Sequence, residues 1–272
     1  MESCKLLEKY KSKLLRDQLS QNTVKAYYFA AYTFLNIYKK ITAENVLSFQ
    51  HYLIENYSPK SVNLQIVAFN RFLTFAGKAD YRLKPIKCRQ ANYLDNVISY
   101  NDYLSFKKNL LLKENKKWYF IVWTLASTGV RISELVQFRV DDIRKGYLDV
   151  RAKGNKVRRV FIPKKLQKDI SAWITGQKFE SGHIFRNKQG FPISIRGITK
   201  GLEREARRLG LDPHLVHPHA FRHLFAKKFL EKNGDIAMLA DLLGHESLDT
   251  TKIYLRKTSH EQQLIIDRIV EW

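Results

Sequence analysis

The sequence contains few cysteines and no long apolar run. Its two cysteines, Cys4 and Cys88, make no disulfide framework, and neither has a second thiol nearby for a metal site. The longest apolar stretch, residues 118–126, includes Thr124 and is far too short to span a bilayer. The first ten residues lack the continuous apolar core of a signal peptide. These absences exclude a secreted disulfide scaffold and predict a cytoplasmic protein with no membrane contact.

Acidic residues are also scarce, because 26 Asp and Glu stand against 48 Lys and Arg, a formal net charge of +22. Such an excess points to a polyanionic partner, although a ribosomal or merely basic cytosolic protein would share it. Residues 1–90 hold 15 basic and 6 acidic residues (+9), which leaves 33 and 20 (+13) for the remainder. Since both halves are basic and no lysine-rich tail carries the excess, DNA contacted along most of the chain is expected.

The N-terminal region predicts a small bundle of four helices. Leucines at helical spacing mark a helix over residues 1–18, and Ser20 begins the capping sequence of a second helix. A third apolar segment covers residues 46–54, and Pro59 opens a fourth helix. The basic segment that follows contains Pro85 and no acidic residue, which is typical of a linker. We therefore expect three parts: a helical domain 1–82, a linker 83–94 and a second domain 95–272.

The second region is predicted to be mainly α with one small antiparallel hairpin. Residues 147–151 alternate as a strand, residues 153–156 form a turn and residues 157–162 return as a second strand. The apolar segment 118–125 predicts a buried helix. Further helices are expected at residues 165–175, 197–209, 221–232 and 236–243.

Several polar residues of this region are ordinary when each is taken alone. Arg131 follows a helix-ending turn and could cap a helix or pair with Glu134, three residues on. Lys153 is at a hairpin tip, where a solvated lysine is the usual case. His245 follows Gly244 and could simply end a helix. The functional reading therefore depends on their combination.

In combination these residues resemble the tyrosine recombinase family, the lambda-integrase and Xer group. The resemblance covers residues 95–258, and the six positions follow in family order: Arg131, Lys153, His219, Arg222, His245 and Tyr254. The local sequences agree as well: Thr-Gly-Val-Arg-Ile-Ser-Glu-Leu, Ala-Lys-Gly-Asn-Lys, His-Pro-His-Ala-Phe-Arg-His and Leu-Leu-Gly-His, with Tyr254 nine positions after His245. The resemblance implies an N-terminal, SAM-like core-site DNA-binding bundle and a catalytic domain of the DNA breaking–rejoining fold. It further implies a clamp on double-stranded DNA, with four protomers exchanging strands between two sites through a four-way junction.

The residue types suit the breaking of a phosphodiester. Two guanidiniums, Arg131 and Arg222, can fork onto the non-bridging oxygens as negative charge gathers there. The Tyr254 phenol is a poor nucleophile until a base removes its proton, and His219 is the expected base. His245 would add a hydrogen bond to the phosphate. The family pattern favours Lys153 as the acid for the leaving 5′ oxygen, with Lys156 as the alternative. A covalent phosphotyrosine stores the bond energy, so we expect no metal, no ATP and no other cofactor.

The C-terminal segment from Ser259 to Trp272 is densely apolar and predicts one more helix. It could close the protomer's own core. The resemblance instead implies that it docks into the next protomer of a homo-tetramer, which is the interpretation favoured here.

Three other interpretations fit part of the sequence. His219 and His223 have the i, i+4 spacing of a zinc-binding helix, but no glutamate follows His219 and Pro218 precedes it. A type IB topoisomerase uses similar groups to nick and reseal DNA, although this chain lacks extra clamp segments. A catalytically silent DNA-binding regulator would not need the complete set of groups.

The biological outcome is open between DNA inversion, integration or excision, and dimer resolution. No arm-binding domain precedes the bundle in this sequence. That favours a simple recombinase acting on short inverted-repeat or direct sites, such as a DNA invertase or a Xer-like resolvase.

Overall fold

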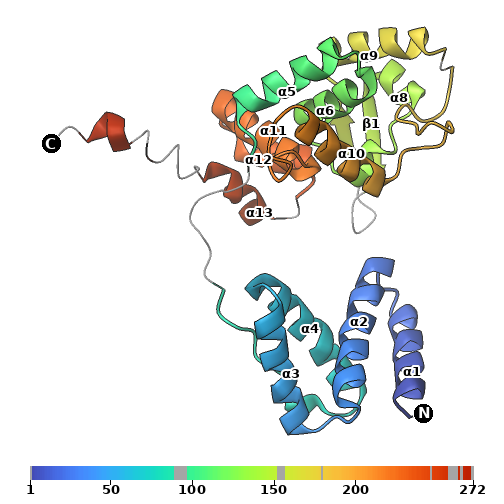
Figure 1. The fold of residues 1–272 in the computed structure, drawn as a ribbon, viewed down its shortest axis with the longest axis vertical. Coiled ribbons are helices and arrows are strands. Elements are labelled where there is room, and N and C mark those ends of the chain that lie inside the picture. The colour runs from blue at the N-terminus through green and yellow to red at the C-terminus, as the bar shows by residue number, and fades with distance from the viewer. Residues whose placement is uncertain are drawn as a thin grey trace. The chain divides into compact units, whose positions relative to one another are not determined.

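The computed structural model describes residues 2–88, 97–151, 157–178, 180–245, 247–256, 263 and 266–270. The chain divides into two compact units, residues 1–90 and 91–272 (Figure 1). Within the described residues, no helix has both the length and the apolar character required to cross a membrane.

The first unit is the predicted helical bundle. Its elements are α1 (Glu2–Arg16), α2 (Gln21–Tyr38), α3 (Ala43–Asn56), α4 (Pro59–Phe75) and the short η1 (Ala79–Tyr81). The local chemistry explains where three of these helices begin. The Ser20 hydroxyl accepts a hydrogen bond from the Thr23 amide at 3.2 Å and caps α2. The Thr42 hydroxyl does the same for α3, and Pro59 occupies the first turn of α4, where its missing amide hydrogen costs nothing.

Aromatic rings fill the core of the first unit. The Phe69 ring centroid lies 4.7 Å from that of Phe34 and 4.8 Å from that of Phe49. Tyr10 of α1 packs edge-on against Phe72 of α4, with their centroids 5.1 Å apart. All five side chains are almost completely buried. Contacts of this density between α1, α2, α3 and α4 give the bundle a hydrophobic core of its own.

Part of the segment predicted as a linker packs on α4. The Asn70 side chain donates to the Leu83 carbonyl at 2.8 Å and accepts from the Leu83 amide at 2.9 Å. Asn63, two helical turns earlier, pairs in the same way with Ile86 at 2.9 and 2.8 Å. Leu83 is buried in the bundle core, whereas Lys84 is exposed. Residues 83–86 thus pack on α4 as an irregular segment held by the amide side chains of Asn63 and Asn70.

The second unit contains the remaining elements. Its helices are α5 (Tyr100–Leu112), α6 (Lys116–Thr128), α7 (Ile132–Leu135), α8 (Val140–Lys145), α9 (Lys164–Gly176), α10 (Ile195–Arg208), α11 (Pro218–Asn233), α12 (Ile236–Leu243) and α13 (Leu248–Lys252), with the 3-10 turn η3 (Ile253–Leu255). The short helices α7, α8 and α13 were missed by the sequence interpretation, because a helix of one turn shows no apolar periodicity.

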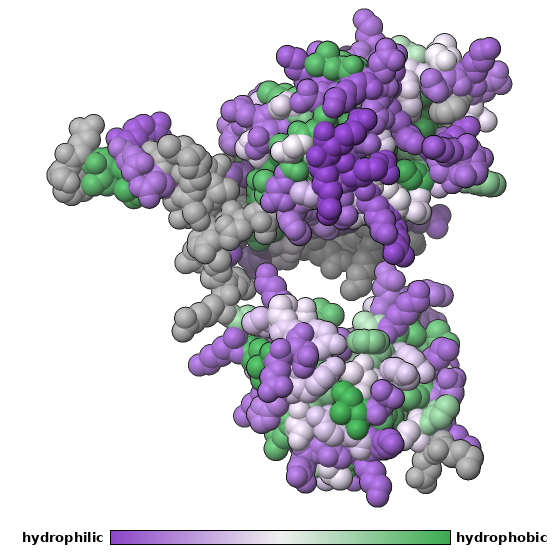
Figure 2. Space-filling model, in the orientation of Figure 1, coloured by the Kyte–Doolittle hydropathy of each residue, from purple (hydrophilic) through white to green (hydrophobic). Residues whose placement is uncertain are grey.

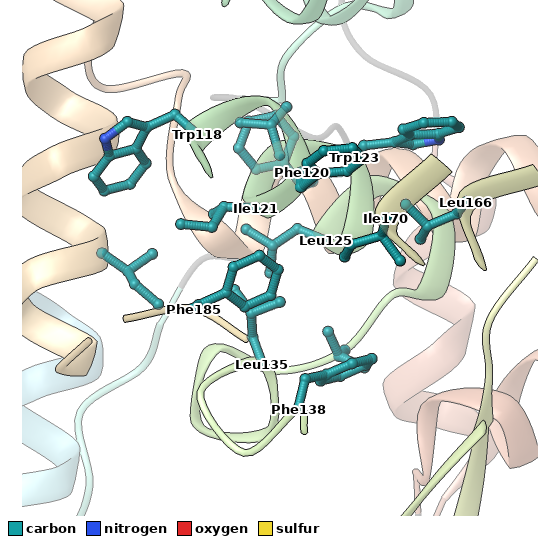
Figure 3. Packing of buried hydrophobic residues seen from close by; sticks show 14 of the residues in the cluster. Trp118, Phe120, Ile121, Trp123, Leu125, Leu135, Phe138, Leu166, Ile170 and Phe185 are labelled. Atoms are coloured by element: carbon teal, nitrogen blue, oxygen red, sulfur yellow. The ribbon is translucent and has the colours of Figure 1, made fainter. Parts of the chain in front are cut away.

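Helix α6 forms the centre of this unit. Ile121, Val122 and Leu125 are fully buried, as predicted for a core helix. Figure 3 shows Ile121 and Leu125 facing side chains from other elements, among them Leu135, Phe138, Ile170 and Phe185. Because α6 is fixed on several sides, the turn that follows it, where Arg131 lies, has a well-defined position.

The predicted hairpin is present as β1 (Tyr147–Arg151) and β2 (Val157–Phe161). The two strands pair antiparallel, from Tyr147 opposite Phe161 to Arg151 opposite Val157. Val160 of β2 is buried on the face toward the core, and Arg158, two positions earlier, lies on that same face. The chain is therefore mainly α, with a helical bundle followed by an α-rich unit that carries one small antiparallel sheet, and the predicted fold class is confirmed.

Candidate active site

Arg131 lies at the start of α7, directly after the turn that ends α6. Gly129 ends α6 in the left-handed conformation, with φ of +62°. The Arg131 amide donates to the Glu134 carboxylate at 2.7 Å, and Nη1 of its side chain contacts the other carboxylate oxygen at 3.3 Å. Nη2 donates to the Gly244 carbonyl at 3.3 Å. The predicted pairing with Glu134 is thus present, and the side chain stays 38% exposed at the edge of a cleft.

Arg222 is buried in the first turns of α11, with 3% of its surface exposed. Nη1 donates to the Gly129 carbonyl at 2.6 Å, and Nη2 donates to the Leu243 carbonyl at 2.8 Å. Both acceptors stand at helix C-termini, where the helix dipole is negative, so they stabilise the cation. Burial, followed by the charge of Arg131, lowers the pKa of Arg222 to about 10. The guanidinium is therefore still charged at neutral pH.

His245 follows Gly244, the residue that ends α12. Its Nε2 lies 3.0 Å from Nη2 of Arg222, and its Nδ1 lies 2.8 Å from the Thr251 hydroxyl. Since a guanidinium only donates, Nε2 accepts here and the ring proton is on Nδ1. Burial and the charges of Arg222, Arg131 and Arg158 lower the pKa of His245 to about 4. The imidazole is neutral, and the Thr251 hydroxyl can serve either ring tautomer because it both donates and accepts.

Tyr254 lies in η3 with 7% of its surface exposed. Its ring is stacked near that of His245, with centroids 6.1 Å apart and planes inclined by 14°. His223 of α11 meets the ring edge-on at 5.0 Å. The Tyr254 side chain also lies close enough to the Arg222 guanidinium to raise the pKa of Arg222, against the larger lowering by burial and by Arg131. The phenol, the buried guanidinium and His245 therefore form one group, although 32 positions separate Arg222 from Tyr254 (254 − 222) in the sequence.

His219 and His223 lie one helical turn apart on α11 but in different surroundings. His219 is exposed, and partial burial together with the charges of Arg222 and Arg131 lowers its pKa. The neutral form that this favours can accept a proton. Burial lowers the pKa of His223 to about 4, and its Nδ1 is buried without a hydrogen-bond partner. Among the described residues, no group of three or more His, Cys, Asp or Glu side chains is arranged to hold a metal ion.

The cleft beside Arg131 has a volume of about 980 Å³. Glu134, Arg158 and His245 line it together with Arg131, and the two hairpin strands form one of its walls. Lys153, and its alternative Lys156, lie outside the described residues, between the end of β1 and the start of β2. Of the six predicted site residues, the structure thus brings Arg131, Arg222, His245 and Tyr254 into one network of contacts. His219 lies near both arginines, whose charges lower its pKa.

Sequence reasoning missed two residues of this site. Thr251 is fully buried and orients the His245 ring, and Arg158 of β2 forms an ion pair with Glu134. Thr251 precedes Tyr254 by three positions, so helical spacing could have indicated it. No local pattern marks Arg158, because its partners are 24 and 84 positions away.

Comparison with known proteins agrees with this architecture. Residues 100–261 match the Phage integrase family. The chain therefore belongs to the phage integrase family, whose members are tyrosine-type DNA recombinases.

Individual relatives resemble the chain over nearly its whole length. Tyrosine recombinase XerA of Pyrococcus furiosus is 30% identical over 270 residues, which cover 97% of this chain and 93% of that protein. The XerH recombinase in its post-cleavage complex with a palindromic difH substrate superimposes with a TM-score of 0.75 at 19% identity, over 98% of this chain and 84% of that one. A lambda integrase dimer bound to a core site gives 0.73 at 18% identity, over 98% and 78%. At these identities the solved structures establish the fold alone.

Proposed function

We propose that this recombinase cleaves and rejoins duplex DNA at specific sites through a covalent 3′-phosphotyrosyl intermediate on Tyr254. The observation that carries the proposal is the convergence of the Tyr254 phenol, the buried Arg222 guanidinium and the neutral His245 imidazole. A guanidinium beside the phenol can stabilise the negative charge that develops as the phenol oxygen attacks a phosphate. Such a pair suits attack on a phosphodiester, whose own charge repels nucleophiles.

In the proposed reaction the Tyr254 oxygen attacks the scissile phosphorus, and the bond from phosphorus to the 5′ oxygen breaks. His219, whose lowered pKa keeps it neutral, takes the phenol proton. Lys153 gives a proton to the leaving 5′ oxygen. Arg131 and Arg222 bind the non-bridging oxygens, where negative charge increases in the transition state. The 5′ hydroxyl of a second strand then attacks the phosphotyrosine, and the same steps run in reverse.

His245 must change its hydrogen bonds to assist in this reaction. In the DNA-free protein Nε2 accepts from Arg222, so it has no proton to give a phosphate. When the phosphate binds Arg222, the ring can shift its proton to Nε2 while the Thr251 hydroxyl donates to Nδ1. Thr251 thus allows His245 to become the phosphate donor expected from the sequence.

DNA binding is supported by the distribution of basic residues. Five of them are exposed along α10: Arg196, Lys200, Arg204, Arg207 and Arg208. Figure 2 shows strongly hydrophilic side chains gathered where Figure 1 has α10. We assign the first unit to binding of the core site, where its exposed Lys84 and Lys87 would contact phosphates. Non-specific binding should therefore weaken steeply with salt.

Assembly as a homo-tetramer on two sites, with exchange of the C-terminal segment, is part of the proposal. Ile266, Ile269 and Val270 are apolar, yet they are 54%, 59% and 38% exposed in the single chain. Side chains of this kind are usually covered by a partner. The proposed partner is the neighbouring protomer of the assembly.

The proposed substrates are two short duplex sites with inverted repeats. The similar XerH structure contains a palindromic difH substrate, and this chain aligns with XerA over nearly the whole length of both proteins. Both likenesses support a simple recombinase that inverts or resolves DNA between such sites. Type IB topoisomerase activity and a silent regulatory role are not favoured, because the relatives reported above are recombinases.

Trapping of the covalent intermediate tests the proposal. Tyr254→Phe, which keeps the ring packing, is used to select binding sites from a pool of randomised duplexes. Each selected site is then nicked near the cleavage position, so that the cut end diffuses away and the adduct accumulates. Wild-type protein and the control Tyr100→Phe should form a denaturation-resistant adduct, and Tyr254→Phe should lose it by a factor on the order of 10⁴ or more. Undiminished adduct from Tyr254→Phe would remove this residue from the nucleophile role.

A further inference from the structure

Arg158 lies in β2, the second strand of the hairpin, and its side chain points toward the protein interior. Its side chain is only 9% exposed, whereas that of its neighbour Arg159 is 47% exposed on the opposite face. Arg159 pairs with Asp149 across the two strands at 2.8 and 2.9 Å. The Arg158 side chain instead points away from β1 and contacts two helices, α7 and α12. A buried guanidinium needs such partners to offset its desolvation.

The contacts of Arg158 connect β2 with α7 and with the end of α12. Nη2 contacts a Glu134 carboxylate oxygen at 2.5 Å, and Nη1 donates to the Leu242 carbonyl at 2.6 Å. The methylene chain packs on Gly244, where a Cβ atom would come within 2.4 Å of Cδ of Arg158. Gly244 also has φ of +64°, so two independent constraints require glycine at this position.

The Arg131 side chain donates hydrogen bonds to two residues, Glu134 and Gly244, and both of them contact Arg158. The Arg131 guanidinium donates to the Glu134 carboxylate and to the Gly244 carbonyl, each at 3.3 Å. Arg158 holds the first through an ion pair and the second through packing. Contacts at 3.3 Å are long for charge-assisted hydrogen bonds, so they leave Arg131 able to reorient unless its acceptors are fixed.

We infer that Arg158 is a positioning residue that holds the Arg131 guanidinium toward the cleft and keeps its charge available to the scissile phosphate. Glu134 is shared between two guanidiniums. Without Arg158, the carboxylate would pair with Arg131 alone, draw it toward α7 and neutralise it. The structural part of this inference concerns the DNA-free protein, and its catalytic consequence rests on the proposed function.

The structural part is tested by NMR of the DNA-free chain, with arginine side chains labelled with ¹⁵N. In wild-type protein and in the control Arg159→Met, the Arg131 side-chain signal, assigned by its loss in Arg131→Lys, should show restricted motion. Arg158→Met should make that signal mobile, and Arg158→Lys should restore part of the restriction through the remaining contact with Glu134. Equal restriction of Arg131 in wild type and in Arg158→Met would overturn the inference, whatever the protein does to DNA.

The catalytic consequence is tested on the nicked site described above. Arg158→Met should bind the site as wild type does but form adduct about 100-fold more slowly, since a misplaced group costs about this much. Arg159→Met should cleave at the wild-type rate. On a site with an uncharged methylphosphonate at the scissile position, the gap between Arg158→Met and wild type should nearly close, because no phosphate charge then needs Arg131.

The outcomes of the two tests are distinguishable. A gap as wide on the methylphosphonate as on the phosphate would overturn the inference, because it would mean that Arg158 acts on the fold rather than through the charge of Arg131. If Arg158→Met does not fold, Arg158→Lys takes its place in both tests, with partial losses expected in each. Absence of adduct with wild-type protein would refute the proposed function, and the NMR measurement would still decide the role of Arg158.

Discussion

The two units of the chain bury different kinds of side chain. The core of the first unit is built from aromatic and aliphatic side chains. Among its described residues, no charged, amide, serine or threonine side chain is buried, although Tyr10 carries its hydroxyl into this core. The second unit buries six such residues within the described part of the chain: Thr124, Thr128, Glu134, Glu205, Arg222 and Thr251. Three of these, Glu134, Arg222 and Thr251, belong to the candidate active site.

The buried side chains of the first unit serve packing alone, whereas those of the second unit include charged groups of the candidate active site. Burying a charged group costs roughly several kcal/mol unless hydrogen bonds or an opposite charge compensate for the lost hydration. In the second unit Arg222 and Glu134 both have such compensating partners. Arg222 receives two helix C-terminal carbonyls, and Glu134 receives Arg131, Arg158 and a backbone amide. The same contacts aim the guanidinium of Arg222 at Tyr254, so stability and reactivity depend on one set of hydrogen bonds.

Removal of a core aromatic ring from the first unit should lower the stability of that unit and leave the second unit unchanged. Phe69→Ala is expected to destabilise the bundle by about 3–5 kcal/mol, the usual cost of deleting a buried ring. Chemical denaturation monitored on each unit separately should show this loss in the first unit only. Adduct formation per bound molecule should equal that of wild type, and a matching loss of cleavage rate at saturating protein would contradict the division of roles.

Substitution of the buried arginine should affect the second unit in both stability and chemistry. Arg222→Lys leaves one helix-end carbonyl unpaired, at a cost of about 1–3 kcal/mol. Because a point charge cannot bind two phosphate oxygens as a guanidinium does, adduct formation should fall by about 10²–10³-fold, while site binding falls far less. Denaturation midpoints, binding isotherms and single-turnover trapping measure the three quantities.

Arg131→Lys is the matched control for that substitution. Its side chain is 38% exposed, so its stability should change little while its cleavage rate falls. If Arg222→Lys lost binding and cleavage by similar factors, Arg222 would hold the DNA rather than stabilise the transition state.

The two units should also respond differently to pH. His223 and His245 have folded-state pKa values of about 4, below the ordinary value of 6.5, so the unfolded chain binds protons first as the pH falls. The stability that their neutral forms contribute is complete above pH 6.5 and is lost between pH 6.5 and about 4. The first unit contains one histidine, the exposed His51.

Urea unfolding of the second unit should therefore move to lower urea between pH 7 and pH 5, and that of the first unit should move much less. His223→Phe, which keeps the ring contact with Tyr254, should reduce the shift. Equal shifts in the two units would show that His223 and His245 do not control the acid response.

Removal of metal ions should have the smallest effect. Adduct formation by wild-type protein is expected to be unchanged in excess chelator, because the proposed chemistry uses only protein cations. Loss of activity in chelator, with recovery on addition of zinc, would instead favour the metal interpretation of His219 and His223.

Local patterns in the sequence were sufficient for most of the fold. Capping residues such as Ser20, strand alternation at residues 147–151 and the apolar segment 118–125 each predicted an element that the structure contains. These signals act within a few residues, which is why they can be read without a structure. The pairing of Asn63 and Asn70 with residues 83–86 could not be read in this way, because it depends on how an extended segment lies along α4.

The candidate site was predicted in part for the same reason. The motifs identified six residue positions, and the structure joins four of them through contacts around Arg222 and Glu134. The tautomer of His245 and the role of Thr251 follow only from the hydrogen-bond geometry. Arg158 was invisible because charge, burial and partner are decided by tertiary contacts between distant segments.

The most direct measurement is to identify the amino acid that carries the DNA. Wild-type protein trapped on the nicked site is digested with protease and nuclease, and the modified peptide is sequenced by mass spectrometry. A 3′-linked nucleotide on Tyr254 is the predicted result. A nucleotide on any other residue of the chain would contradict the proposed mechanism.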